Sequence, residues 1–81
     1  MELTNGVSLF PNPATAKVKV SARESIKTIT VLTLLGRELI RRNDVNKTDE
    51  SIPVALLPEG LYTVQVVTQS KTFSSLLYKA K

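Results

Sequence analysis

The 81-residue sequence contains no cysteine, no histidine and no tryptophan, and each absence excludes a class of protein. Without cysteine, disulfides cannot support the fold and thiolate metal sites cannot form. Without histidine, the usual general base and the commonest metal ligand are both missing. No loop has the glycine spacing of a phosphate site or the oxygen spacing of a calcium site. We therefore expect a protein that is not an enzyme and that carries no cofactor.

Long apolar runs and clustered charge are missing as well. No stretch approaches the roughly 18 apolar residues that a transmembrane helix needs. Residues 1–5 lack the basic start and apolar run of a secretory signal, so we expect any export signal of a parent protein to lie outside this sequence. The net charge is +4, but the only adjacent basic pair is Arg41-Arg42, and aromatic residues make up only 5%. Nucleic-acid binding is therefore not expected.

The length allows one small domain with a thin core and no deep cavity. Its dominant pattern is two-residue alternation, which is typical of half-buried strands. The alternation is clearest in Ala16–Ala22 and Tyr62–Val66, and β-branched residues are frequent in Ile26–Leu34. We expect two further strands, Val7–Phe10 and Thr72–Tyr78, at the two ends of the domain.

Proline, glycine and polar residues punctuate these strands. Leu32–Arg42 is ambiguous, because leucines recur there at helical spacing, but Gly36 in its middle favours strand, turn and strand over a helix. We expect a polar loop at Asn46–Asp49, and Pro53 indicates that Ser51–Leu56 lies at a sheet edge. Gln69-Ser70 is expected to close the last hairpin. The prediction is an all-β, Ig-like antiparallel sandwich of about seven short strands.

Four turn-centred segments, in order, resemble one known family. Ser8–Thr15 contains Phe-Pro-Asn-Pro-Ala, Ile29–Glu38 is a strand leading to Gly-Arg, Leu57–Val64 contains Leu-Pro-Glu-Gly-Leu-Tyr, and Lys71–Lys79 is a final strand with lysines. Together they resemble the type A C-terminal sorting domains of the type IX secretion system of Bacteroidetes. The sequence departs from the usual family pattern at Leu32, Thr33 and Ser75-Leu76, where an aromatic residue, Asp or Asn, and lysines are common.

The resemblance implies a sorting signal that directs a larger cargo protein across the outer membrane. It implies residues 1–6 as a linker or expression-derived segment and residues 7–81 as the sorting domain, with the cargo fused before it. The implied partners are the outer-membrane translocon and a sortase-like peptidase that cuts the domain off. The implied route is through the periplasm to the cell surface or the exterior.

The residues that we expect to carry the signal are turn residues and residues of the last hairpin. They are Pro11, Asn12, Pro13, Gly36, Arg37, Pro58, Gly60, Tyr62, Lys71, Leu77, Lys79 and Lys81. Gly36 and Gly60 are expected to supply positive φ, and Tyr62 to pack in the core with its hydroxyl bonded near the corner. Arg37 is expected to be solvated or paired with Glu38, although its guanidinium could reach a carboxylate or phosphate.

We favour the final hairpin as the docking surface, because no acidic residue follows Glu59 while Lys71, Lys79 and Lys81 are basic. It could dock by strand addition along an exposed edge or by charge pairing, with exposed Leu76 and Tyr78 as apolar anchors. Alternatively, these residues merely complete the sheet. Deletion of residues 79–81 is expected to impair export with little loss of folding.

Two other functions stay open. One is an Ig-like adhesion or carbohydrate-binding module that binds its ligand through Asn43–Glu50, although the scarcity of aromatics disfavours a sugar platform. The other is an appendage that stabilises a neighbouring enzyme. Exposed edges could also support a weak or swapped homodimer of an isolated domain.

Overall fold

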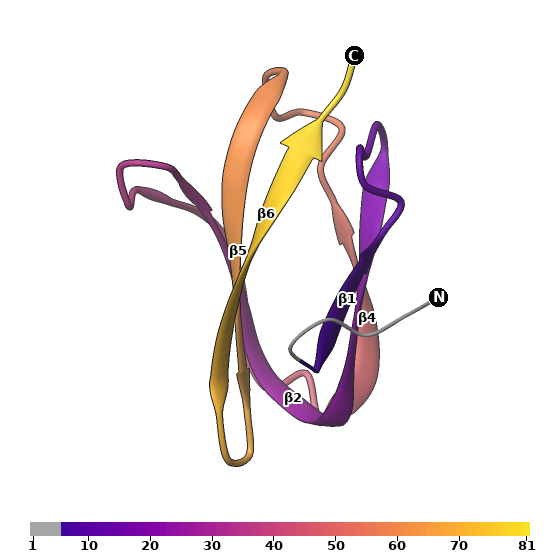
Figure 1. Ribbon diagram of the computed structural model, residues 1–81, viewed down its shortest axis with the longest axis vertical. Coiled ribbons are helices and arrows are strands. Elements are labelled where there is room, and N and C mark those ends of the chain that lie inside the picture. The colour runs from indigo at the N-terminus through magenta and orange to yellow at the C-terminus, as the bar shows by residue number, and fades with distance from the viewer. Residues whose placement is uncertain (1–5) are drawn as a thin grey trace.

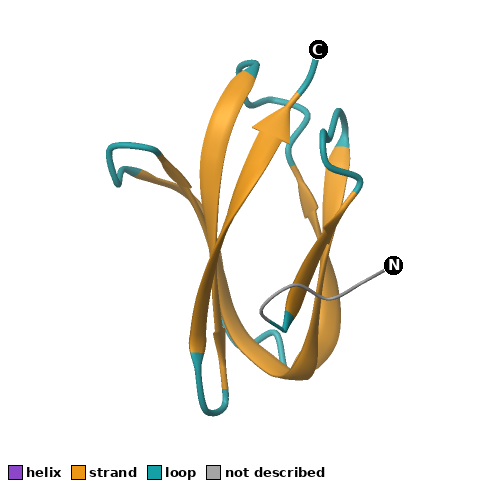
Figure 2. Cartoon of the chain, in the orientation of Figure 1, coloured by secondary structure: helices purple, strands orange, loops and turns teal. Residues whose placement is uncertain are grey.

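Residues 6–81 are described by a computed structural model, and the expected linker at residues 1–6 lies almost wholly outside them. The described chain consists of strands and loops, with no helix (Figure 2). The six strands are β1 (Val7–Phe10), β2 (Lys17–Thr33), β3 (Glu38–Arg42), β4 (Lys47–Pro53), β5 (Gly60–Thr68) and β6 (Thr72–Lys79). The described part thus has no helix long and apolar enough to cross a membrane.

The strands form one antiparallel sheet that is organised by the long, bent strand β2 (Figure 1). The first half of β2 pairs with β1 on one side and β4 on the other. Its second half pairs with β3 and β5, and β6 then pairs with β5. The pairing register shifts between Ser21 and Ile26 and again between Ile26 and Thr28, where β2 changes partners. The sheet therefore curls so that its two halves enclose one core.

The expectation of seven separate strands was wrong in one respect. Ala16–Ala22 and Ile26–Leu34 are parts of the single strand β2, because the intervening Arg23-Glu24-Ser25 keeps an extended backbone through the bend instead of turning. The strand–turn–strand interpretation of Leu32–Arg42 is confirmed: β2 ends at Thr33 and β3 begins at Glu38.

The expected polar loop at Asn46–Asp49 was also wrong, since β4 begins at Lys47. Its first three residues are exposed and polar, which an edge strand tolerates because, among residues 6–81, β4 pairs with β2 alone and leaves these side chains in water. Pro53, which ends β4, lies at this edge as predicted.

The core is one cluster of aliphatic side chains from both halves of the sheet. The fully buried members with the largest side chains include Val18, Val20, Ile26, Ile29, Val31, Ile52, Val64, Val66 and Leu77. Alternate residues of β2 and β5 supply most of them, as the two-residue periodicity predicts.

Candidate recognition surface

The last hairpin, β5 and β6, is closed by a short turn that is tied to the bend of β2. The Thr68 N–H donates to the Lys71 carbonyl (2.8 Å), so the turn lies at Gln69-Ser70 as predicted. The Glu24 carboxylate accepts hydrogen bonds from the hydroxyls of Thr68 (2.7 Å) and Ser70 (2.8 Å). These two bonds lower the pKa of Glu24 below its usual value. Sequence reasoning missed this role of Glu24, because the pairing spans 44 residues.

The outward face of this hairpin carries exposed apolar side chains. Leu76 is 59% exposed and Tyr78 is 37% exposed, as expected from the alternation of β6. Leu61, which is 49% exposed, lies opposite Tyr78 in the β5–β6 register. We call Leu61, Leu76 and Tyr78 the outer patch. The Tyr78 hydroxyl donates to the Glu59 carboxylate (3.0 Å), which raises the pKa of Tyr78.

The inward face of β6 holds two residues that the sequence analysis assigned to the signal. Leu77 is fully buried in the core, and Lys79 is only 5% exposed. The Lys79 ammonium donates to the carbonyl of Ala80 (2.9 Å). Of the three lysines of the predicted basic surface, Lys71 and Lys81 are exposed and Lys79 is not. Lys79 follows Leu77 by two residues, so the strand alternation turns it inward.

The Pro11-Asn12-Pro13 turn covers the outer edge of β6. Both its X-Pro bonds, Phe10-Pro11 and Asn12-Pro13, are cis. The Asn12 side chain donates through Nδ2 to the Leu76 carbonyl (3.1 Å) and accepts through Oδ1 from the Tyr78 N–H (3.0 Å). This carboxamide thus pairs with the strand as a neighbouring peptide group would.

The residue after this turn continues the pairing. The Ala14 N–H donates to the Tyr78 carbonyl (2.9 Å), and the Ala80 N–H donates to the Ala14 carbonyl (2.8 Å). The C-terminal half of the β6 edge is therefore already occupied, and strand addition by a partner cannot take place there.

The Gly36 turn joins β2 to β3 in a hairpin that projects from the body of the domain (Figure 1). Gly36 has a φ of 93°, which confirms the predicted need for glycine. Arg37 is exposed at this turn, and Glu38 pairs with Arg41 instead of Arg37 (2.8 Å). The bidentate contact with Arg41 lowers the pKa of Glu38.

The Pro58–Gly60 corner fixes the start of β5. The Tyr62 hydroxyl donates to the Pro58 carbonyl (2.6 Å), and the Tyr62 ring is buried. Gly60 has a φ of 151°, a region that favours glycine. Both observations confirm the predicted tyrosine corner.

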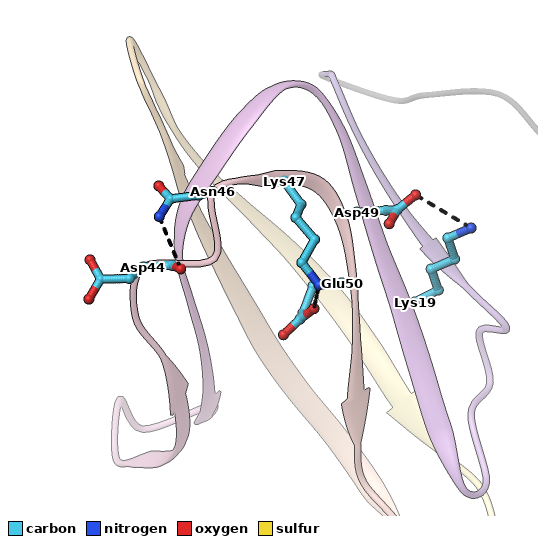
Figure 3. A network of polar contacts seen from close by, with 6 residues as sticks. All are labelled: Lys19, Asp44, Asn46, Lys47, Asp49 and Glu50. Carbon is cyan, nitrogen blue, oxygen red and sulfur yellow. Dashed lines mark hydrogen bonds and ion pairs between the residues drawn. The ribbon is translucent and has the colours of Figure 1, made fainter.

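Several polar side chains of the Asn43–Glu50 segment, which the adhesion-module alternative requires, are engaged within the domain (Figure 3). The Asn46 side chain donates to the Asp44 carbonyl (3.3 Å), Lys47 pairs with Glu50 (3.4 Å), and Asp49 pairs with Lys19 (3.6 Å). Within residues 6–81, no group of three side chains is placed to hold a metal ion. The backbone N–H groups of Val45 and Asn46 donate to the carbonyls of Lys27 and Ile26 on β2, and residues from Lys47 onward belong to β4.

The chain thus forms a small all-β domain whose surface carries the apolar outer patch and several well-defined turns. Comparison with family models matches residues 8–79 to the secretion system C-terminal sorting domain. The chain belongs to this family, the C-terminal sorting domains of type IX secretion. No curated protein matches the chain.

Family membership gives the function in outline. Domains of this family are sorting signals and not a catalytic family. The chain is thus a C-terminal sorting signal for type IX secretion, which implies export across the outer membrane toward the cell surface or beyond. A sorting signal acts on a cargo protein to which it is fused and interacts with the secretion machinery.

Proposed function

We propose that this domain passes through the periplasm on a larger cargo protein and is recognised by the outer-membrane translocon through the outer patch. A sortase-like peptidase then cuts the chain before the domain. In this proposal the curled sheet is an Ig-like sandwich, and β2 contributes one strand segment to each of its two layers. One layer consists of three strand segments, β1, β4 and the first half of β2, and the other consists of four, β3, β5, β6 and the second half of β2.

The observation that carries the proposal is the exposure of the outer patch. Leu76 and Leu61 have about half of their surface in water, although neighbouring Leu77 is fully buried. Apolar side chains that gather on one face of a small domain favour association with a partner. The patch lies on the face of the hairpin, which stays open to a partner even though Asn12 and Ala14 occupy the edge of β6.

Charge supports the same surface. Exposed Lys81 lies three residues after Tyr78 of the outer patch, while exposed Lys71 lies at the turn at the opposite end of the hairpin, and no acidic residue follows Glu59. An acidic rim on the translocon would then orient the domain while the outer patch supplies the apolar contact. Pro11, Pro13, Gly36, Pro58, Gly60 and Tyr62 would contribute by holding the shape, as would the backbone of Arg37 through its bonds to Thr33, and Asn12, Leu77 and Lys79 by fixing β6.

The test is export of a periplasmic reporter fused before residues 1–81 in a bacterium with the type IX system. We expect the double variant L61S/L76S to lower export at least several-fold while its thermal unfolding stays close to that of the parent, because both side chains are exposed. L35S is the matched control, since Leu35 is 98% exposed on the β2–β3 hairpin. Unchanged export of L61S/L76S, or equal loss in L35S, would contradict the role of the outer patch.

A further inference from the structure

The β2–β3 hairpin leaves one backbone edge without a strand partner. Among residues 6–81, β3 pairs with β2 alone, so the N–H and C=O groups on its other side meet no neighbouring strand. Such an edge can accept a further extended segment. It differs from the edge of β6, whose C-terminal half is occupied by Asn12 and Ala14. It also differs from β4, which ends in Pro53 and so lacks one donor.

An apolar groove of about 390 Å³ lies beside this edge, between β3 and the chain that follows β4. We call it the β3 groove; it is lined by Leu39, Ile40, Pro53, Ala55, Leu56 and Leu57. Leu56 is 99% exposed and Leu39 is 37% exposed, while Ile40 and Leu57 pack against the core. The groove therefore offers apolar contact next to unpaired backbone groups, the two features that an added strand uses.

The charge beside the groove selects among the segments that could occupy it. Glu38 is engaged by Arg41 through both of its oxygens, which leaves exposed Arg37 and Arg42 at the two ends of β3 outside the ion pairs found in residues 6–81. Residues 37–42 carry three arginines and one glutamate, a net charge of +2, so a second copy of the domain paired through its own β3 would be repelled by this net positive charge. Acidic side chains on the added segment would instead be attracted, and guanidinium groups bind carboxylates in bidentate fashion.

We infer that the β3 edge and the β3 groove bind an extended protein segment whose apolar centre is flanked by acidic residues at both ends, because Arg37 and Arg42 flank the two residues of β3 that line the groove, Leu39 and Ile40. The segment adds to β3 as an antiparallel or parallel strand. Its apolar side chains enter the β3 groove, and its carboxylates reach Arg37 and Arg42. This surface is separate from the outer patch, so it gives the domain a second contact that does not depend on the proposed translocon surface.

The inference can be tested with the 81-residue chain and a synthetic peptide. The probe is a capped seven-residue peptide with glutamate at positions 1, 2, 6 and 7 and valine at positions 3–5, added to isotope-labelled protein and followed by amide chemical shifts. We expect shifts to concentrate at residues 37–42 and 54–57, and the amide hydrogens on the outer edge of β3 to exchange more slowly. Shifts confined to β5 and β6, or none at millimolar peptide, would overturn the inference.

Two altered peptides separate strand addition from simple charge attraction. Methylation of alternate peptide nitrogens on the edge that faces β3 should abolish the shifts, because it removes the backbone donors while keeping the charge. Replacement of glutamate by lysine should weaken binding about tenfold or more, since the arginines would then repel the peptide. Equal binding of either altered peptide would contradict the proposed mode.

Two matched variants and one control experiment complete the test. R42E should weaken binding of the glutamate peptide about tenfold or more, and R23E, an equal change of charge at an exposed residue on β2, should leave it within about twofold. Equal weakening by both would show that only net charge matters. Shifts at residues 37–42 that depend on protein concentration without peptide would mean that a second copy covers the groove, which would overturn the proposal.

Discussion

Replacement of Asn12 by alanine is the sharpest test of whether the Asn12 side chain holds the edge of β6. The N12A variant loses two hydrogen bonds, one of 3.1 Å to the Leu76 carbonyl and one of 3.0 Å from the Tyr78 N–H. A hydrogen bond contributes about 0.5–1.5 kcal/mol net, and water can partly replace these bonds at an exposed site, so we expect a loss of about 1–2 kcal/mol in the free energy of unfolding.

That loss is large for a domain of this size. A domain of about 80 residues has an unfolding free energy of about 4–12 kcal/mol, and 1 kcal/mol corresponds to about 4–8 °C in melting temperature. N12A should therefore melt about 4–16 °C lower, as measured by circular dichroism. The amide hydrogen of Tyr78 should also exchange faster, because its acceptor is gone.

The control is N43A, since Asn43 is an exposed asparagine in the β3–β4 connection. We expect its melting temperature to stay within about 2 °C of the parent value. A shift of less than about 2 °C in N12A, with the Tyr78 amide still protected, would refute the conclusion that the Asn12 carboxamide holds the edge of β6.

Three further predictions concern the core, the corner and the titration of the domain. L77A should lose about 2–5 kcal/mol because its side chain is fully buried, whereas L76A should change stability by less than about 0.5 kcal/mol, both measured by urea unfolding; similar losses would contradict the assigned faces of β6. Y62F should lose about 1 kcal/mol with the loss of the 2.6 Å bond to Pro58, and an unchanged unfolding midpoint would contradict that bond. The pKa of Glu24 is lowered on folding, so its contribution is present above the unfolded pKa and disappears as the pH falls through the folded pKa. E24Q should therefore flatten the fall of melting temperature in the acidic range, and identical profiles for both proteins would contradict the anchoring of the hairpin turn.

Much of the local structure was predictable because it rests on local chemistry. Alternation located β5 and β6, the Pro11-Asn12-Pro13 turn marked the end of β1, and Gly36 correctly favoured a turn over a helix between β2 and β3. The tyrosine corner followed from the spacing of Pro58, Gly60 and Tyr62. These features depend on residues that are close together in the sequence, where turn preferences and strand periodicity act.

Other features depend on contacts that the local sequence does not signal. The bend of β2 has an extended backbone throughout, whereas the apolar alternation of the sequence stops at Ala22 and resumes at Ile26, which suggested two strands. The bonds of Asn12 span 64 and 66 residues, and its polar side chain alone gives no hint of pairing with β6. The strand alternation after Leu77 indicates that Lys79 points inward, but its positive charge led to the prediction that it is exposed.

The burial of Lys79 also changes one experiment. Deletion of residues 79–81 would remove a buried side chain and the bond between Ala80 and Ala14, so it would weaken folding as well as remove charge. We therefore no longer expect this deletion to spare folding, and the substitution K81E takes its place as the test of the C-terminal charge. Lys81 is exposed, and the substitution changes charge alone.

As a C-terminal sorting signal, this domain directs a fused cargo through the type IX system. The most direct measurement is the location of a reporter fused before residues 1–81 in two otherwise identical strains, with and without a working type IX translocon. The reporter carries its own signal for the inner membrane. We predict that it reaches the cell surface or the medium only in the strain with the translocon and stays in the periplasm of the other. Retention in the periplasm of both strains, or release from both, would contradict the claim.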